Sequence, residues 1–133
     1  MIVVDTSVVI GFLRGAESGA IARFEALDRE PLGFALPNIV CQEVLLGARD
    51  AREWRLLEAY LSSQPRIDST DPWATHRGAA RLYFDCRRRG LTVRSSVDCW
   101  IAQLAIERDA TLLHDDDDFE VLAKVAPLRT SRG

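Results

Sequence analysis

The sequence is poor in lysine, cysteine and histidine. Lys124 is the only lysine among 17 basic residues, so a mechanism that needs a catalytic lysine has one candidate, near the C-terminus. The three cysteines are an odd number without CxxC spacing, which argues against a disulfide framework or a zinc site and favours a reducing cytosol. We therefore expect a cytoplasmic protein whose cysteines are small buried residues.

Long hydrophobic runs are absent as well. No apolar run approaches the ~20 residues of a membrane span. The N-terminal segment lacks the basic region of a signal peptide and meets an acid at Asp5. The net charge of −3 argues against holding nucleic acid by bulk charge, but it permits a metal site and a local arginine patch. We expect residues 1–133 to form a single domain, since domains span ~100–200 residues.

What the sequence does contain is an alternation of short β-rich runs with helical periodicity. The pattern predicts strands at residues 2–4, 33–36, 66–68, 111–114 and 127–129, and helices at residues 17–28, 38–48, 50–61, 72–89, 96–108 and 119–125. We expect an α/β fold with a central, mainly parallel sheet of four to five strands, covered on both faces. The first and fourth strands are the most apolar and are expected at its centre.

Several polar residues stand at the predicted helix starts. Asn38, Asp50, Asp71 and one of Ser95 and Ser96 are expected to cap the helices that follow them. Gly90 is expected to end the helix that begins at residue 72.

Acidic residues stand near the predicted strand ends, where ligands bind in parallel sheets. Asp5 follows the first strand, Asp115–Asp118 follow the fourth, Asp98 opens the helix before the fourth, and Glu43 lies in the helix after the second. Ordinary roles remain open for three of these. Asp5 can cap a helix that starts at Thr6, Asp98 can stabilise a helix dipole, and the run of four can be a solvated loop.

Glu43 is harder to assign to the surface. It shares a helical stripe with Ile39, Val40 and Val44, and a glutamate on a core-facing stripe costs free energy unless it is compensated. Several carboxylates in one cleft raise one another's pKa unless a cation neutralises them. Oxygen ligands select Mg²⁺, Mn²⁺ or Ca²⁺, and Mg²⁺ can activate water for attack on a phosphodiester. The acids thus predict cleavage of nucleic acid without catalytic lysine, histidine or cysteine.

Four segments carry these acids in a recognisable order. They are Ile-Val-Val-Asp-Thr-Ser from residue 2, Gln-Glu-Val-Leu-Leu-Gly from residue 42, Val-Asp-Cys-Trp-Ile-Ala from residue 97, and Thr-Leu-Leu-His-Asp-Asp-Asp-Asp-Phe from residue 111. They resemble the four motifs of the PIN domain, and the arrangement is similar to the VapC toxins of bacterial toxin–antitoxin pairs. The resemblance covers essentially the whole chain.

The resemblance implies a Mg²⁺- or Mn²⁺-dependent endoribonuclease with a three-layer α/β/α fold. It implies a catalytic set of Asp5, Glu43, Asp98 and Asp116, with Asp5, Asp98 and Asp116 as metal ligands and Thr6 or Ser7 in support. It also implies an RNA substrate, a homodimer, and a cognate VapB antitoxin that occupies the cleft.

The last motif departs from the family pattern at two positions. His114 stands where a small hydroxyl residue is usual, and Asp117 stands where a basic residue is common. Asp118 is therefore the alternative to Asp116 as the fourth acid. His114 is expected to be neutral at the edge of the core, or else to touch a phosphate. Arg94, which closely precedes the third motif, is expected near the cleft.

Other functions compete with this interpretation. A receiver domain also binds Mg²⁺ at strand ends, but it needs a lysine after its last strand, and Lys124 lies in a predicted helix. A haloacid-dehalogenase phosphatase needs Asp-x-Asp after the first strand, where this chain has Asp5-Thr6-Ser7. Nucleotide-binding glycine motifs are absent. A catalytically silent interaction module is the alternative from another class, and the presence of all four acids disfavours it.

The helix predicted from residue 72 carries two distinct faces. Arg77, Arg81, Phe84 and Arg88 share one sector, and Ala79, Leu82, Tyr83 and Cys86 are expected to face the core. The arginine sector is either simply solvated or a patch for RNA phosphate or an antitoxin, with Phe84 as its aromatic anchor.

Overall fold

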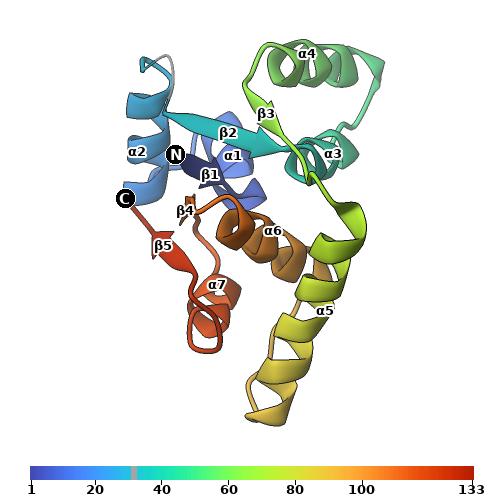
Figure 1. The fold of residues 1–133 in the computed structure, drawn as a ribbon. Helices are drawn as coiled ribbons and strands as arrows, with labels where there is room; N and C mark the ends of the chain where they lie inside the picture. The colour runs from blue at the N-terminus through green and yellow to red at the C-terminus, as the bar shows by residue number, and fades with distance from the viewer. Residues whose placement is uncertain (31–32) are drawn as a thin grey trace.

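A five-stranded parallel sheet lies at the centre of the computed structural model, which describes residues 1–30 and 33–133 (Figure 1). The strands are β1 (Ile2–Val4), β2 (Phe34–Pro37), β3 (Arg66–Ile67), β4 (Thr111–Leu113) and β5 (Arg129–Ser131). The helices are α1 (Thr6–Leu13), α2 (Gly19–Leu27), α3 (Asn38–Leu46), α4 (Ala51–Ser62), α5 (Pro72–Arg88), α6 (Ser96–Glu107) and α7 (Asp117–Leu122). The predicted α/β class is confirmed.

The strand order is β3-β2-β1-β4-β5. Val3 pairs with Ala35 on one side and with Leu112 on the other, so β1 is central and β4 lies beside it, as predicted. The chain leaves β1 toward β2 and β3 and then returns to place β4 on the opposite side of β1. This reversal opens a crevice at the carboxyl ends of β1 and β4, where ligands bind in open α/β sheets.

Helices cover the sheet in two groups. Helix α1 contacts α2 and α3, and α3 contacts α4; on the other side α5 packs on α6, and both contact α7. Parallel crossovers are right-handed, and the sheet grows in opposite directions from β1. The two groups therefore cover opposite faces, which gives three layers. Phe24 and Leu27 of α2 and Ile101 of α6 are buried in the core.

The helix caps follow most of the sequence predictions. Asp50 accepts a hydrogen bond from the backbone nitrogen of Glu53, and Asp71 accepts one from that of Ala74. Gly90 has a φ of 71°, a left-handed conformation that suits glycine after the end of α5. The prediction for Asn38 is wrong. Pro37 occupies the cap position, and the Asn38 amide donates to Asp68 instead.

Near the C-terminus two elements begin at other residues than predicted. Helix α7 covers residues 117–122 rather than 119–125, because Asp116 caps it by accepting from the backbone nitrogen of Asp118. Strand β5 covers residues 129–131 rather than 127–129, because Arg129 is the residue that pairs with Thr111.

On α5 the predicted core side holds for Ala79, Leu82 and Cys86, which are buried. It is wrong for Tyr83, which is 41% exposed because it lies at the edge of the buried stripe, with the Arg87 guanidinium over its ring. Phe84 is 40% exposed, as its place on the arginine face predicted. The guanidinium carbons of Arg81 and Arg88 lie 5.2 and 5.6 Å from the centre of its ring.

The three cysteines are buried, as expected, and none is paired among the described residues. Within the same residues, no helix combines the length and the apolar character needed to cross a membrane.

Candidate active site

Asp5 follows β1 directly and therefore lies at the carboxyl end of the central strand. Its Oδ2 accepts hydrogen bonds from the backbone nitrogen of Ser7, at 3.0 Å, and from the Ser7 hydroxyl, at 2.6 Å. Its Oδ1 is buried and has no hydrogen-bond partner in the described chain. Burial raises the pKa of Asp5 to about 6 despite these donors. One oxygen thus caps α1, and the other is left without the partner that a buried carboxylate needs.

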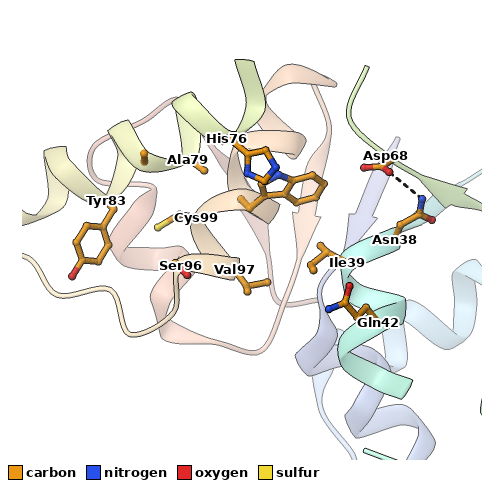
Figure 2. Close-up of a pocket in the computed structure, with 12 residues that line it drawn as sticks. Asn38, Ile39, Gln42, Asp68, His76, Ala79, Tyr83, Ser96, Val97 and Cys99 are labelled. Carbon is orange, nitrogen blue, oxygen red and sulfur yellow. Dashed lines mark hydrogen bonds between the residues drawn. The ribbon is translucent and has the colours of Figure 1, made fainter. Parts of the chain in front are cut away.

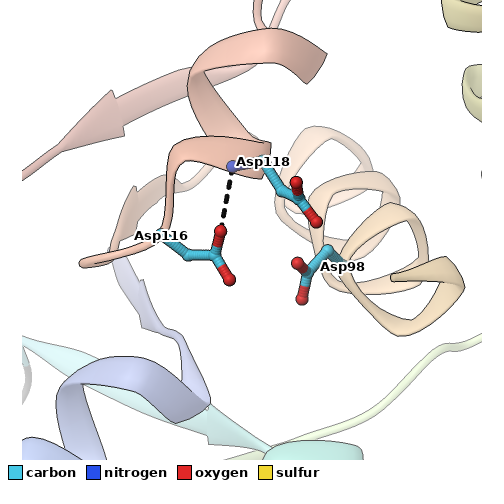
Figure 3. Close-up of side chains that lie close together, drawn as sticks. All are labelled: Asp98, Asp116 and Asp118. Carbon is cyan, nitrogen blue, oxygen red and sulfur yellow. Dashed lines mark hydrogen bonds between the residues drawn. The ribbon is translucent and has the colours of Figure 1, made fainter. Parts of the chain in front are cut away.

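Three more carboxylates lie close together (Figure 3). Asp98 lies in the first turn of α6, Asp116 precedes α7, and Asp118 lies in the first turn of α7. One oxygen from each lies within 4.8 Å of the other two, a spacing suited to a shared cation.

The pKa values of Asp98 and Asp118 shift in opposite directions. Burial, the hydrogen bond with Asp118 and the charges of the neighbouring acids raise the pKa of Asp98 to about 9. Burial alone would favour protonation of Asp118 too, but hydrogen bonds from Asp98 and Arg94 outweigh it and lower the pKa of Asp118. Without a bound cation, Asp98 is therefore the protonated partner at neutral pH.

Arg94 lies at the cleft, as predicted, and spans two of these acids. Its Nη2 lies 3.1 Å from Oδ1 of Asp116, and its Nε lies 3.3 Å from Oδ1 of Asp118. The backbone nitrogens of Arg94 and Ser95 donate to the second oxygen of Asp118. Both oxygens of Asp118 are therefore already engaged by donors. On Asp116, Oδ1 alone accepts, from Arg94 and from the backbone of Asp118.

Among the described residues, Glu43 makes one short hydrogen bond. The Thr6 hydroxyl donates to its Oε1 at 2.6 Å, and the side chain is half-buried rather than enclosed in the core. Its charge contributes to the raised pKa of Asp5, so the two acids are close enough to interact. Glu43 and Asp5 nevertheless lie outside the group formed by Asp98, Asp116 and Asp118. Both Thr6 and Ser7 support an acid by hydrogen bonding, as the sequence implied.

The remaining acids of the run point to the surface. Asp115 is exposed and accepts from the Ser18 hydroxyl, and Asp117 is exposed and pairs with Arg132. His114 is fully buried, and burial lowers its pKa. Its Nδ1 accepts from the backbone nitrogen of Asp116, so Nε2 carries the proton and donates to Glu120 at 2.9 Å. His114 is thus the neutral residue at the core edge that was expected.

The sequence did not indicate one role of Asp118. Asp118 satisfies the backbone at the start of α6, where Ser95 occupies the cap position but makes no side-chain cap. The sequence predicted only that Ser95 or Ser96 would cap α6. It gave no sign that a carboxylate from another helix would bind the backbone there.

The chain is similar to known proteins over nearly its whole length. The PIN domain family matches residues 2–125. Ribonuclease VapC11 of Mycobacterium tuberculosis is 36% identical over 134 residues, which cover 98% of each chain. The VapBC-5 toxin–antitoxin structure of the same organism has 28% identity and a TM-score of 0.67, covering 98% of this chain and 97% of that one. VapBC2 of Rickettsia felis has 20% identity and a TM-score of 0.74, with 98% of each chain covered, and supports the fold alone.

Proposed function

The chain belongs to the PIN-domain family, and from that membership we propose that it is a divalent-cation-dependent endoribonuclease, the toxin of a VapB–VapC pair. Its nearly full-length similarity to a named VapC ribonuclease supports the activity. The observation that carries the proposal is the buried, unpartnered Oδ1 of Asp5 at the same crevice as three clustered carboxylates.

The residues present fit a hard cation. The donors are carboxylate oxygens only, which suit Mg²⁺ or Mn²⁺. Asp5, Asp98 and Asp116 would hold the ion, since Asp5 and Asp116 each retain an oxygen that no described residue engages. When bound, the cation supplies positive charge for hydrolysis of a phosphodiester. Its charge would also replace the proton on Asp98, which is the acid with the most strongly raised pKa.

The other residues around the site have separate roles. Asp118 is a positioning residue, because its oxygens are held by the start of α6 and thereby fix Asp98. Thr6 fixes Oε1 of Glu43 and leaves Oε2 to accept a proton from the attacking water. The Arg94 guanidinium, 70% exposed, offers donors to a phosphate at the edge of the cleft.

The partners follow from the same family relation. VapBC-5 is described as a toxin–antitoxin system, and this chain resembles it over nearly its whole length. We expect a VapB-type antitoxin to occupy the cleft and a homodimer to form. The exposed Phe84 with its two arginines is the surface we expect to serve one of these contacts.

The test is cleavage of RNA by the purified protein. We expect cuts with Mg²⁺ or Mn²⁺, none in EDTA, and 5′-phosphate with 3′-hydroxyl ends, because hydrolysis uses water rather than the ribose 2′-hydroxyl. Asp98→Asn is the matched inactive variant, since it keeps the size of a side chain that is already protonated. Equal cleavage in EDTA, or 2′,3′-cyclic phosphate ends, would overturn the mechanism. A silent interaction module would cut RNA under neither condition.

A further inference from the structure

A cavity of about 670 Å³ is lined by residues of α3, α5 and α6 (Figure 2). Ile39, Val97 and Ala79 form its apolar wall. Aromatic side chains come from His76, Tyr83 and Trp100. Its volume falls in the range typical of small-molecule sites, ~300–1,000 Å³.

On two helices, a residue that lines the cavity stands directly before a residue of the acid site. Gln42, which lines the cavity, immediately precedes Glu43 on α3. Val97, which lines it from the other side, immediately precedes Asp98 on α6. Consecutive residues on a helix lie ~3.8 Å apart at Cα and point to neighbouring sectors. A strand whose phosphodiester lies at the acids therefore has the cavity within reach of its next base.

The aromatic residues offer faces to a flat ligand. The rings of His76 and Trp100 have centroids 6.3 Å apart and are inclined at 51°, so they form an open angle rather than a closed stack. His76 and Tyr83 are exposed, and Trp100 is half-buried. Unpaired RNA bases are recognised by stacking on such aromatic rings.

Two carboxamides supply hydrogen-bonding groups at the α3 side. Asn38 and Gln42 are both exposed. Asn38 donates through Nδ2 to Oδ2 of Asp68 at 3.2 Å, which fixes the amide and leaves its oxygen as an acceptor (Figure 2). Asp68, the acidic residue of the lining, is occupied by this contact and by the backbone nitrogen of Ser69. At the other end, Arg87 lies over the Tyr83 ring and adds positive charge.

We propose that this cavity is a subsite for an unpaired nucleobase of the RNA strand whose phosphodiester lies at the acid cluster. The inference rests on the proposed ribonuclease activity. The cavity combines aromatic faces, carboxamides and a neighbouring guanidinium, and it lies beside the proposed phosphodiester-cleaving centre. This combination fits a single-stranded nucleotide better than a protein segment. The aromatic side chains bind the base by stacking, and Asn38 and Gln42 contact its polar edge.

The experiment measures RNA binding in an Asp98→Asn background, which does not cleave. In this background Trp54→Phe and Trp73→Phe leave Trp100 as the remaining tryptophan, and both replaced residues are exposed and outside the lining of the cavity. Single-stranded oligo(A), oligo(C) and oligo(U) are titrated against Trp100 fluorescence, with an abasic oligomer of equal length as the ligand control. We expect at least one base-bearing oligomer to quench Trp100 and the abasic one not to.

Variants of the exposed lining residues complete the test. His76→Ala and Gln42→Ala should each weaken binding of the quenching oligomer by ~5-fold or more and leave binding of the abasic oligomer unchanged. Arg55→Ala, exposed on α4, is the matched control and should change neither. Equal affinities for base-bearing and abasic RNA would overturn the subsite. So would unchanged affinity in both variants, or a change in oligomeric state alone, which would assign the cavity to a second copy. In each of these cases the unmodified protein would still cleave RNA. Failure of the proposed ribonuclease function would instead appear as no cleavage of any RNA.

Discussion

Arg94 and Asp118 are joined twice: the backbone nitrogen of Arg94 donates to Oδ2 of Asp118 at 3.1 Å, and the Arg94 side chain donates to Oδ1 at 3.3 Å. The backbone nitrogen of Ser95 adds a third bond at 3.2 Å. A carboxylate of α7 therefore binds the backbone of the two residues directly before α6, the helix that carries Asp98. Positioning of one acid of the site depends on another acid from a different part of the chain.

Replacing Asp118 by asparagine should destabilise the protein. Asparagine keeps one acceptor oxygen, but its amide nitrogen then faces hydrogen-bond donors. The charge-assisted hydrogen bonds that the buried Asp118 carboxylate accepts are therefore partly lost. We expect the free energy of unfolding to fall by ~1–3 kcal/mol, measured by urea denaturation in EDTA. Asp116→Asn is the control and should change it little, because asparagine caps a helix as well as aspartate. Equal stability of the two variants would contradict the assigned role of Asp118.

Replacing Asp116 by asparagine should instead weaken cation binding. The rise in melting temperature on adding Mn²⁺ should shrink, because ligand stabilisation depends on the ratio of concentration to dissociation constant. RNA cleavage should fall by orders of magnitude. Asp115→Asn and Asp117→Asn should leave both unchanged, since those side chains are exposed. If Asp116→Asn keeps both properties and Asp118→Asn loses the Mn²⁺ response, the fourth ligand is Asp118.

Stability without a cation should fall as pH rises. The pKa of Asp98 is about 9 in the folded protein, against an ordinary value of 3.8, so between these values the folded state binds a proton that the unfolded state does not. The contribution of Asp98 is therefore fully present below pH ~4 and is lost as pH rises through ~9. Asp5, raised to about 6, acts in the same direction over a narrower range.

Asp98→Asn isolates this contribution. The difference in unfolding free energy between the unmodified protein and the variant, measured in EDTA across this range, should shift in favour of the variant as pH rises. A difference that does not change with pH would contradict the raised pKa of Asp98.

Glu43→Gln should separate cleavage from cation binding. Glu43 is not one of the three proposed ligands and is held by Thr6, so its replacement by glutamine of the same size leaves Asp5, Asp98 and Asp116 in place. We expect single-turnover cleavage to fall by ~10²-fold or more, as for loss of a general base, while Mn²⁺ affinity measured by calorimetry changes little. A matched loss of Mn²⁺ affinity would make Glu43 a ligand instead.

Phe84→Ala should act on assembly and not on the fold. The side chain is 40% exposed and covered by two arginines of its own helix, so its loss removes little core packing. We expect weaker self-association by light scattering or weaker binding of a VapB-type antitoxin, with an unchanged melting temperature of the monomer. If oligomeric state and antitoxin affinity are both unchanged, the face is simply solvated.

The sequence predicted the elements whose signals are local. Apolar runs located β1 and β4 at the centre of the sheet, and Asp50 and Asp71 marked helix starts through their own side chains. It failed at Asn38 and at Tyr83. Asn38 does not cap α3, because the helix begins at Asn38 itself and Pro37 occupies the cap position. Tyr83 is exposed because packing of α5 against α6, rather than helical spacing alone, sets the edge of the buried stripe.

The candidate site could likewise be predicted only in part. Convergence of strand-end acids could be expected from a parallel sheet, and Asp98 and Asp116 do lie close together, whereas Asp5 lies outside their group. Which oxygens are engaged could not, since that depends on Ser7, Arg94 and the backbone of α6. Four adjacent aspartates look alike in sequence, and only their separate partners distinguish exposed Asp115 from buried Asp118.

The strand order has a consequence for how the protein is made. Strand β4 lies beside the first strand of the sheet yet comes from residues 111–113, and the acids that complete the crevice follow it. Synthesis proceeds from the N-terminus, so a growing chain carries Asp5 and Glu43 long before Asp116 and Asp118 exist. The carboxylate cluster therefore cannot assemble until residues 116–118 have been made, and a growing chain that stops before them lacks two of its three carboxylates.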